Sequence, residues 1–174
     1  MKSKAGFSIP LLAVLAAFSA AARAGPLAYV PSGDFVKVVD TATGTVVATI
    51  GGFSNAYGVV SLSPDGSKAY VSQSVPSNLK VIDTATNSIT ATVGTGIYPY
   101  DVNFSPDGSK AYVTNANSGT VSVINTATTS VTATIPAGFN PTAVAIAPNG
   151  SRVYVTNAHV GAFGPNTVSV IDPA

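Results

Sequence analysis

Cysteine, tryptophan and glutamate are absent from the chain, and histidine occurs once. Without cysteine the protein forms no disulfide, has no thiolate nucleophile and cannot carry the lipid anchor of a bacterial lipoprotein. Charged residues make up only 9% of the chain and hydrophobic residues 46%, a balance that excludes a disordered protein. A fold without disulfides must be stabilised by packing alone.

Helix-forming residues are concentrated in the N-terminal 24 residues, which have the layout of a secretory signal peptide. Lys2 and Lys4 form a short basic region, and an uncharged Ala/Leu-rich stretch follows over residues 5–22. The segment ends on the small-x-small pattern Ala22-Arg23-Ala24.

The pattern predicts cleavage between Ala24 and Gly25. An uncleaved membrane anchor is the alternative. Pro10 and the short apolar length oppose it, because a spanning helix needs about 20 apolar residues. We therefore expect a secreted bacterial protein, periplasmic or at the cell surface, with no transmembrane span after signal removal.

Basic residues become scarce once the signal segment is removed, since three of the eight lie within it and all seven acidic residues lie outside. Residues 25–174 then carry a net charge of about −2. Neither the basic patch of a nucleic-acid-binding protein nor a polybasic lipid-binding stripe is present.

An internal repeat organises residues 25–174. The phrase SPDGSKAYV occurs at residues 63–71 and again at 105–113. Four tyrosines lie in equivalent positions, 41, 42 and 42 residues apart: Tyr29, Tyr70, Tyr112 and Tyr154. The repeats span approximately residues 27–68, 69–110, 111–152 and, in part, 153–174.

Each repeat contains four short runs rich in Val, Ile, Thr and Tyr with a period of two, as in TVSVIN at 120–125. This pattern predicts half-buried strands. Four strands and their turns fill about 40 residues, the size of one propeller blade. The fold class is therefore all-β, a β-propeller of four-stranded antiparallel blades.

The strings AYVTN, SPDGSK and VSVIDPA resemble the YVTN-type β-propeller repeat family of secreted and surface-layer-associated proteins. That family is similar to the propellers of quinoprotein amine dehydrogenases and lactonases. The resemblance covers roughly residues 27–172 and is specific for the fold rather than for an activity. No catalytic residue of those enzymes is matched here, so none is carried over.

The repeated polar residues are interpreted as turn formers. Pro64-Asp65-Gly66 is a turn sequence, and Asn149 replaces Asp65 and Asp107 in the third copy, which a turn tolerates. The Tyr of AYV is interpreted as a ring between blades with a solvated hydroxyl.

A second repeated turn begins at Asp40, Asp83 and Asn125, whose side chains are expected to cap it. Gly44 and Asn87 suit a left-handed position near its end, where Thr129 is a departure.

With strands a to d counted outward from the channel, the a–b and c–d turns share one end of the blades, here called the constant-turn face. The b–c and d–a loops share the other end, the variable-loop face, where functional loops are expected. Its d–a loops are residues 51–58, 94–101 and 136–143, and its b–c loops are 31–35, 73–78, 115–119 and 157–166.

Candidate binding residues lie on this variable-loop face. They comprise aromatic side chains, one carboxylate near the start of an inner strand and the single imidazole: Tyr98, Tyr100, Asp101, His159 and Phe163. A capped strand start is the alternative for the carboxylate, and a solvated loop histidine is the alternative for the imidazole. No second His or Cys completes a metal site, and no Ser-His-Asp order, phosphate loop or haem-attachment motif is present, so no metal, cofactor or catalytic residue is expected.

Three functions stay open. The primary hypothesis, which favours a non-enzyme, is an exported binding or interaction scaffold whose partner is a protein or small ligand. A lactonase-like or amine-dehydrogenase-like enzyme or redox-associated subunit, with its site at the channel mouth, is the second. A structural component of the cell envelope or surface layer is the third.

Counting the predicted strands gives three in the first repeat, four in the second and third, and three in the last, about three and a half blades. Closed propellers have 4 to 8 blades. A fragment of a longer propeller, a half-ring completed by a second copy through open blade edges, and an open arc are the three explanations.

Overall fold

The structure is a computed structural model, and it describes residues 26–54, 56, 58–158 and 166–173. These residues form 14 strands in four antiparallel sheets, with one short 3-10 helix, η1 (Ala116–Ser118). The sheets contain three, four, four and three strands in chain order, as the strand count predicted. The expected fold class, a partial propeller of antiparallel blades, is confirmed.

Each sheet is a meander of neighbouring strands. Blade 1 consists of β1 (Leu27–Ser32), β2 (Phe35–Asp40) and β3 (Thr45–Ile50). Blade 2 consists of β4 (Val60–Leu62), β5 (Lys68–Gln73), β6 (Asn78–Asp83) and β7 (Ser88–Gly94). Blade 3 consists of β8 (Pro99–Phe104), β9 (Lys110–Asn115), β10 (Thr120–Asn125) and β11 (Ser130–Pro136). Blade 4 consists of β12 (Pro141–Ile146), β13 (Val153–Asn157) and β14 (Thr167–Ile171).

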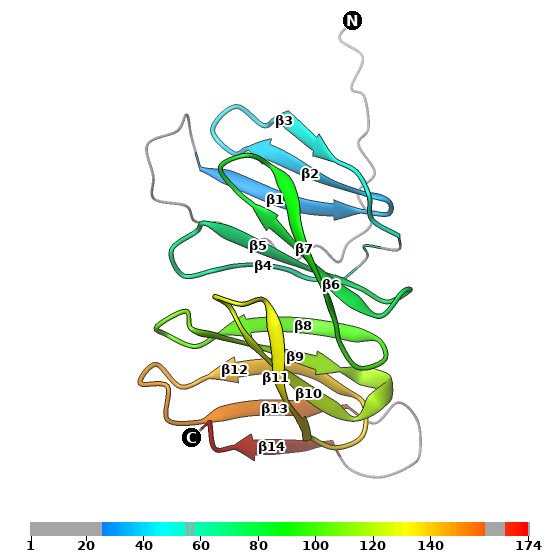
Figure 1. Cartoon of the computed structure of the whole chain (residues 1–174), viewed down its shortest axis with the longest axis vertical. Coiled ribbons are helices and arrows are strands. Elements are labelled where there is room, and N and C mark those ends of the chain that lie inside the picture. Colours follow the sequence, from blue (N-terminus) through cyan, green and yellow to red (C-terminus); the bar gives the residue numbers. More distant parts are fainter. Residues whose placement is uncertain (1–25, 55, 57, 159–165, 174) are drawn as a thin grey trace, which may run out of the picture.

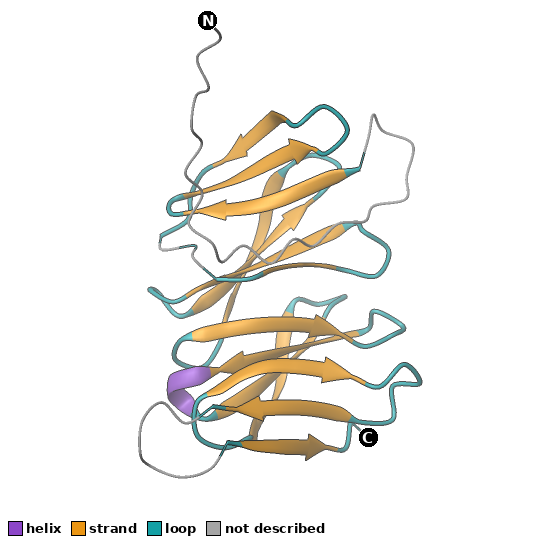
Figure 2. Cartoon of the chain, turned by 180° about the vertical axis from the view of Figure 1, so that it is seen from behind, coloured by secondary structure: helices purple, strands orange, loops and turns teal. Residues whose placement is uncertain are grey.

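The blades are stacked in chain order, and blades 1 and 4 lie at opposite ends of the stack (Figure 1). The a–b turns lie at the left edge in that view, the c–d turns lie left of the centre, and the b–c and d–a loops lie at the right edge. Figure 2 shows the same division from behind, with η1 among the variable loops. The predicted separation of constant turns from variable loops is therefore confirmed.

Three apolar cores lie between successive blades, because each strand directs alternate side chains to opposite faces of its sheet. Between blades 2 and 3, for example, Tyr70 and Val81 belong to the same buried cluster as Val113 and Ile124. The ring of Tyr70 meets that of Phe104 edge-on, with centroids 5.0 Å apart. Apolar side chains buried between the sheets thus stabilise a fold that has no disulfides.

Regular bulges bend the blades. The ladder between strands c and d shifts register at the same place in three blades. The shifts fall between Val38 and Val39 in blade 1, between Val81 and Ile82 in blade 2, and between Val123 and Ile124 in blade 3. Such bulges increase the right-handed twist of a sheet.

Candidate binding face

The constant turns hold their own aspartates tightly. Ser63 Oγ donates to Asp65 at 2.6 Å, and both the backbone N–H and the hydroxyl of Ser67 donate to the same carboxylate at 3.0 and 2.8 Å. These hydrogen bonds lower the pKa of Asp65, and the same set lowers the pKa of Asp107 to about 2. Asn149 accepts the corresponding bonds from Ser151. The interpretation as turn residues is confirmed.

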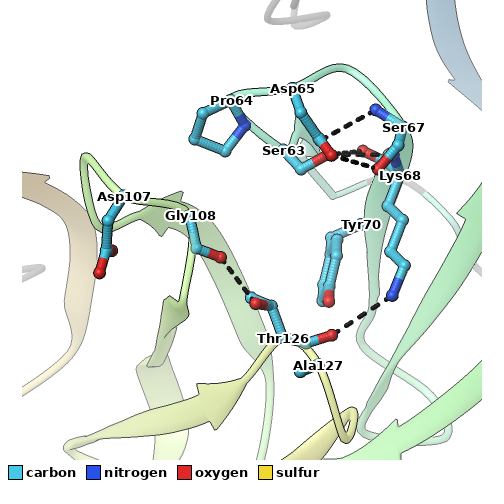
Figure 3. A pocket seen from close by; sticks show the side chains of 10 residues that line it. All are labelled: Ser63, Pro64, Asp65, Ser67, Lys68, Tyr70, Asp107, Gly108, Thr126 and Ala127. Atoms are coloured by element: carbon cyan, nitrogen blue, oxygen red, sulfur yellow. Dashed lines mark hydrogen bonds between the residues drawn. The ribbon is translucent and has the colours of Figure 1, made fainter.

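Two cavities nevertheless open on the constant-turn face, which the sequence pattern did not predict. One, of about 290 Å³, lies between blades 2 and 3 (Figure 3), and the other, of about 610 Å³, lies between blades 3 and 4. Both are lined by a turn Asp, a Lys and a Tyr of one blade and by turn residues of the next. The sequence feature that could have indicated these cavities is the recurrence of charged Asp and Lys at one edge of successive blades.

A lysine crosses each cavity to the following blade. Lys68 Nζ donates to the carbonyl of Thr126 at 3.3 Å, and Lys110 Nζ donates to that of Pro173 at 2.9 Å. The carboxylates of Asp65 and Asp107 are engaged within their own turns, and that of Asp172 pairs with Arg152. These cavities are therefore lined mainly by polar groups that already have partners.

The tyrosine hydroxyls differ from the expectation of a solvated group. Tyr29 donates to Asn87 Oδ1 of the next blade at 2.8 Å. Tyr70 is fully buried, its hydroxyl points toward the segment 126–127 in Figure 3, and it has no hydrogen-bond partner among the described residues. Burial raises the pKa of this hydroxyl. The prediction of a solvated hydroxyl was wrong for Tyr70, because the next blade covers the ring.

On the variable-loop face, the loop between blades 2 and 3 is fixed from both sides. The N–H of Tyr98 donates to Ser77 Oγ of blade 2 at 3.2 Å, and that of Ile97 donates to Ser118 Oγ of blade 3 at 2.7 Å. The N–H of Ala116 also donates to the Tyr98 carbonyl at 2.9 Å. Tyr98 has a φ of 60°, a left-handed conformation that is strained for an aromatic residue and is held by these contacts.

Large apolar side chains project from these loops into solvent. Val75, Ile97, Tyr98 and Phe139 are 62%, 61%, 40% and 63% exposed. Ile97 and Phe139 occupy equivalent positions in successive d–a loops, so the repeat presents an apolar side chain at the same place twice. A rigid backbone and exposed apolar tips suit the capture of another surface.

Asp101 lies within β8 and links two blades. Its carboxylate accepts the N–H of Val102 of its own strand and that of Val144 of blade 4, each at 2.9 Å. Burial raises the pKa of Asp101, and these two hydrogen bonds partly offset that rise. Each carboxylate oxygen therefore accepts a main-chain N–H. This is the arrangement expected if Asp101 caps the start of a strand, which was the alternative to a binding role.

The other predicted site residues divide into two groups. Tyr98 is exposed and Tyr100 is half-buried, next to Asp101 in the chain, and neither lines the two cavities. His159 and Phe163 lie outside the described residues, as do Ala24 and Gly25 of the predicted cleavage site. The structure thus places three of the five binding candidates at the start of one inner strand.

Within the described part of the chain, no group of three or more His, Cys, Asp or Glu residues could hold a metal ion. In the same residues, no helix is long and apolar enough to cross a bilayer. Chemically, the variable-loop face offers apolar contact and main-chain hydrogen bonding.

Comparison with solved structures places the fold among propeller-containing proteins. The chain superposes on Kuenenia stuttgartiensis hydrazine synthase with a TM-score of 0.77 at 24% identity, covering 84% of this chain and 42% of that one. A functionally unknown protein from Desulfotomaculum acetoxidans DSM 771 matches with a TM-score of 0.71 at 18% identity, covering 84% of this chain and 48% of the other. This chain thus spans less than half the length of either, and no curated protein matches its sequence.

The family model of the YNCE-like beta-propeller matches residues 6–119, more than half of the chain. The match includes the first two repeats and the start of the third, which carry the strings SPDGSK and AYVTN. Together with the antiparallel blades, it confirms the resemblance: the chain belongs to the YNCE-like beta-propeller family.

Proposed function

We propose that this protein is exported and acts as a non-catalytic scaffold that binds a protein partner through its variable-loop face. The observation that carries the proposal is the set of exposed apolar side chains on loops fixed by both neighbouring blades. Because the loop backbone is already ordered, a partner that covers these tips gains apolar burial at a low cost in loop entropy.

The hydrogen bonding of Asp101 supports a non-catalytic role. A general base must reach a substrate proton, whereas both oxygens of this carboxylate accept main-chain N–H groups. The enzyme hypothesis predicts that Asp101→Ala combined with His159→Ala abolishes a turnover. The scaffold proposal predicts that a variant with both substitutions binds the partner largely as the wild type does.

The binding proposal is tested with Ile97→Ser combined with Phe139→Ser. Partner retention from the cell-envelope fraction is measured by quantitative mass spectrometry on the immobilised protein, with Val47→Ser and Val131→Ser as the control. The control residues are exposed on the outer strands β3 and β11. If the test variant and the control variant both lose the partner, or if both retain it, the variable-loop face is not the binding surface.

Export is tested separately by the mass of the protein recovered from the periplasm or the medium. We expect a chain that begins at Gly25. Recovery only from the cytoplasm, with the first 24 residues attached, would refute export.

A further inference from the structure

The cavity between blades 2 and 3 contains a buried polar group with spare hydrogen-bonding capacity. Tyr70 lines this cavity of about 290 Å³ and is 0% exposed. Its hydroxyl has no hydrogen-bond partner among the described residues. The edge-on contact with Phe104 fixes the ring, and the hydroxyl points toward the segment 126–127, which lines the same cavity (Figure 3). A buried hydroxyl without a partner is costly, so a molecule that supplies the partner gains affinity there.

The equivalent hydroxyl one blade earlier has two acceptors in the next turn. Tyr29 Oη donates to Asn87 Oδ1 at 2.8 Å and lies 3.4 Å from the Thr84 carbonyl oxygen. For Tyr70, Thr129 stands in the place of Asn87, and the Thr129 hydroxyl donates to the carbonyl of the preceding residue instead. Tyr70 therefore lacks the first of these acceptors.

A lysine occupies the second acceptor. Lys68 stands where blade 1 has Leu27, and its Nζ donates to the carbonyl of Thr126, the counterpart of Thr84, at 3.3 Å. This distance exceeds the usual range of about 2.7–3.2 Å for N–H···O bonds, whereas Lys110 Nζ lies 2.9 Å from its own acceptor. An ammonium group carries three donors on a flexible stem. The link from Lys68 is therefore weak, and a ligand oxygen can replace the carbonyl.

The charges around the cavity favour an uncharged ligand. The carboxylates of Asp65 and Asp107 line it together with the ammonium of Lys68. An anion would meet an excess of negative charge, and a cation would find the carboxylate oxygens already bonded within their turns. A ligand hydroxyl, in contrast, can accept from Tyr70 or Lys68 and can donate to the Thr126 carbonyl once the ammonium has left it.

We propose that this cavity binds a single neutral sugar ring. Lys68 and Tyr70 donate to hydroxyls of the ring, and the released carbonyl of Thr126 accepts from one. Pro64 and Ala127 also line the cavity and supply apolar surface for the C–H groups of the sugar. Its volume lies at the lower end of the range for small-molecule sites, about 300–1,000 Å³, which suits one ring rather than a longer ligand.

The inference is independent of the proposed function. The sugar site lies on the constant-turn face, whereas the scaffold proposal places a protein partner on the variable-loop face. A single sugar ring leaves the constant-turn face without a protein partner.

The test is a titration of the isotope-labelled full chain, followed through the amide NMR signals of the residues that line the cavity. The probes are D-glucose, D-galactose and D-mannose, each compared with its uronate and its amino sugar. At least one neutral hexose should shift these signals, and its two charged forms should bind roughly tenfold more weakly. No shift with any neutral hexose, as expected of a cavity that holds only water, would overturn the proposal. Equal or tighter binding of a charged form would also overturn it.

Tyr70→Phe removes the hydroxyl and keeps the ring. The affinity for the neutral hexose should fall roughly tenfold, whereas stability against urea should be unchanged or higher, because no described hydrogen bond is lost. Thr129→Asn should also lower the affinity, because the amide offers Tyr70 a protein acceptor, as Asn87 does for Tyr29. Unchanged affinity in either variant would contradict the proposal.

The matched control is Tyr29→Phe, which removes the same atom at the same position of blade 1. Its hydroxyl donates to Asn87, so this variant should lose stability and keep the wild-type affinity for the sugar.

Lys68→Met tests the ammonium group, with Lys110→Met as its control. The first should lose affinity roughly tenfold, and the second should not, because Lys110 is outside the lining of this cavity. Equal losses in test and control variants would mean that the sugar binds elsewhere and would overturn the assignment. None of these substitutions lies on the variable-loop face, so the sugar site and the scaffold proposal can fail separately.

Discussion

Tyr70 and Thr129 show how one residue difference between repeats changes a contact between blades. One blade earlier, Tyr29 donates to Asn87 of the next turn. Thr129 occupies the position of Asn87, and its hydroxyl donates to the Thr128 carbonyl at 2.8 Å. Its φ of 53° is left-handed, which is unfavourable for a β-branched residue. The contact thus combines backbone strain with a buried hydroxyl that has no described partner.

Replacing Thr129 by Asn should stabilise the protein. The amide tolerates the left-handed backbone and offers Tyr70 an acceptor, so we expect a gain of about 1–2 kcal/mol in the free energy of unfolding. Urea denaturation measures it. The reciprocal Asn87→Thr should destabilise by a similar amount, and a stabilising effect of that change would contradict the explanation.

Asp107 makes a pH-dependent contribution to the stability of the fold. Its folded pKa of about 2 lies below the ordinary value of 3.8, so its carboxylate stabilises the fold above pH 4. This contribution is lost as the pH falls from about 4 to about 2. Asp107→Asn, the residue found at 149, should therefore lose less stability over that interval than the wild type.

Thermal unfolding across this pH range provides the measurement. Asp34→Asn, at an exposed position outside the constant turns, serves as the control and should follow the wild-type curve. Identical acid sensitivity in Asp107→Asn and the wild type would show that the turn carboxylate has no such effect.

The inner strands share a side-chain hydrogen bond that compensates for their irregular pairing. In blades 3 and 4 the ladder between strands a and b shifts register near the start of strand a. A hydroxyl from strand b accepts the N–H of Val59, Asp101 or Ala143 at 3.0 to 3.1 Å in the three blades that have a strand a among the described residues. These hydroxyls belong to Ser72, Thr114 and Thr156.

Thr114→Val tests this hydrogen bond with a side chain of the same shape. Thr114 is fully buried, so removal of its oxygen leaves the Asp101 N–H without that acceptor. We expect a loss of about 1–3 kcal/mol by urea denaturation. Thr134→Val, at an exposed position on β11, should change stability by less than about 0.5 kcal/mol. Equal effects of both substitutions would rule out the hydroxyl contact as the cause.

The strands and turns could be predicted from the sequence because their signals are local. A period of two defines the strands, and Pro64-Asp65-Gly66 defines a turn within three residues. The bond from Val144 to Asp101 and the burial of Tyr70 join residues of different blades, which lie tens of positions apart in the chain. They depend on how adjacent blades are tilted and spaced, which a single repeat does not specify.

For the whole molecule, stacking separates the repeated turns from the variable loops. Constant residues form the turns and the faces between blades, whereas the variable loops meet at one edge of the stack. The two cavities lie on the other edge, where most polar groups already have partners. This division is the basis for assigning binding to the variable-loop face.

The most direct test of that assignment is site-specific photo-crosslinking in the cell envelope. A photoreactive amino acid is placed in turn at Val75, Ile97 and Phe139 on the variable-loop face and at Asp65 and Asp107 on the constant-turn face. The account predicts one discrete crosslinked partner from the first set and none from the second. The same partner captured only from the constant-turn positions would contradict it.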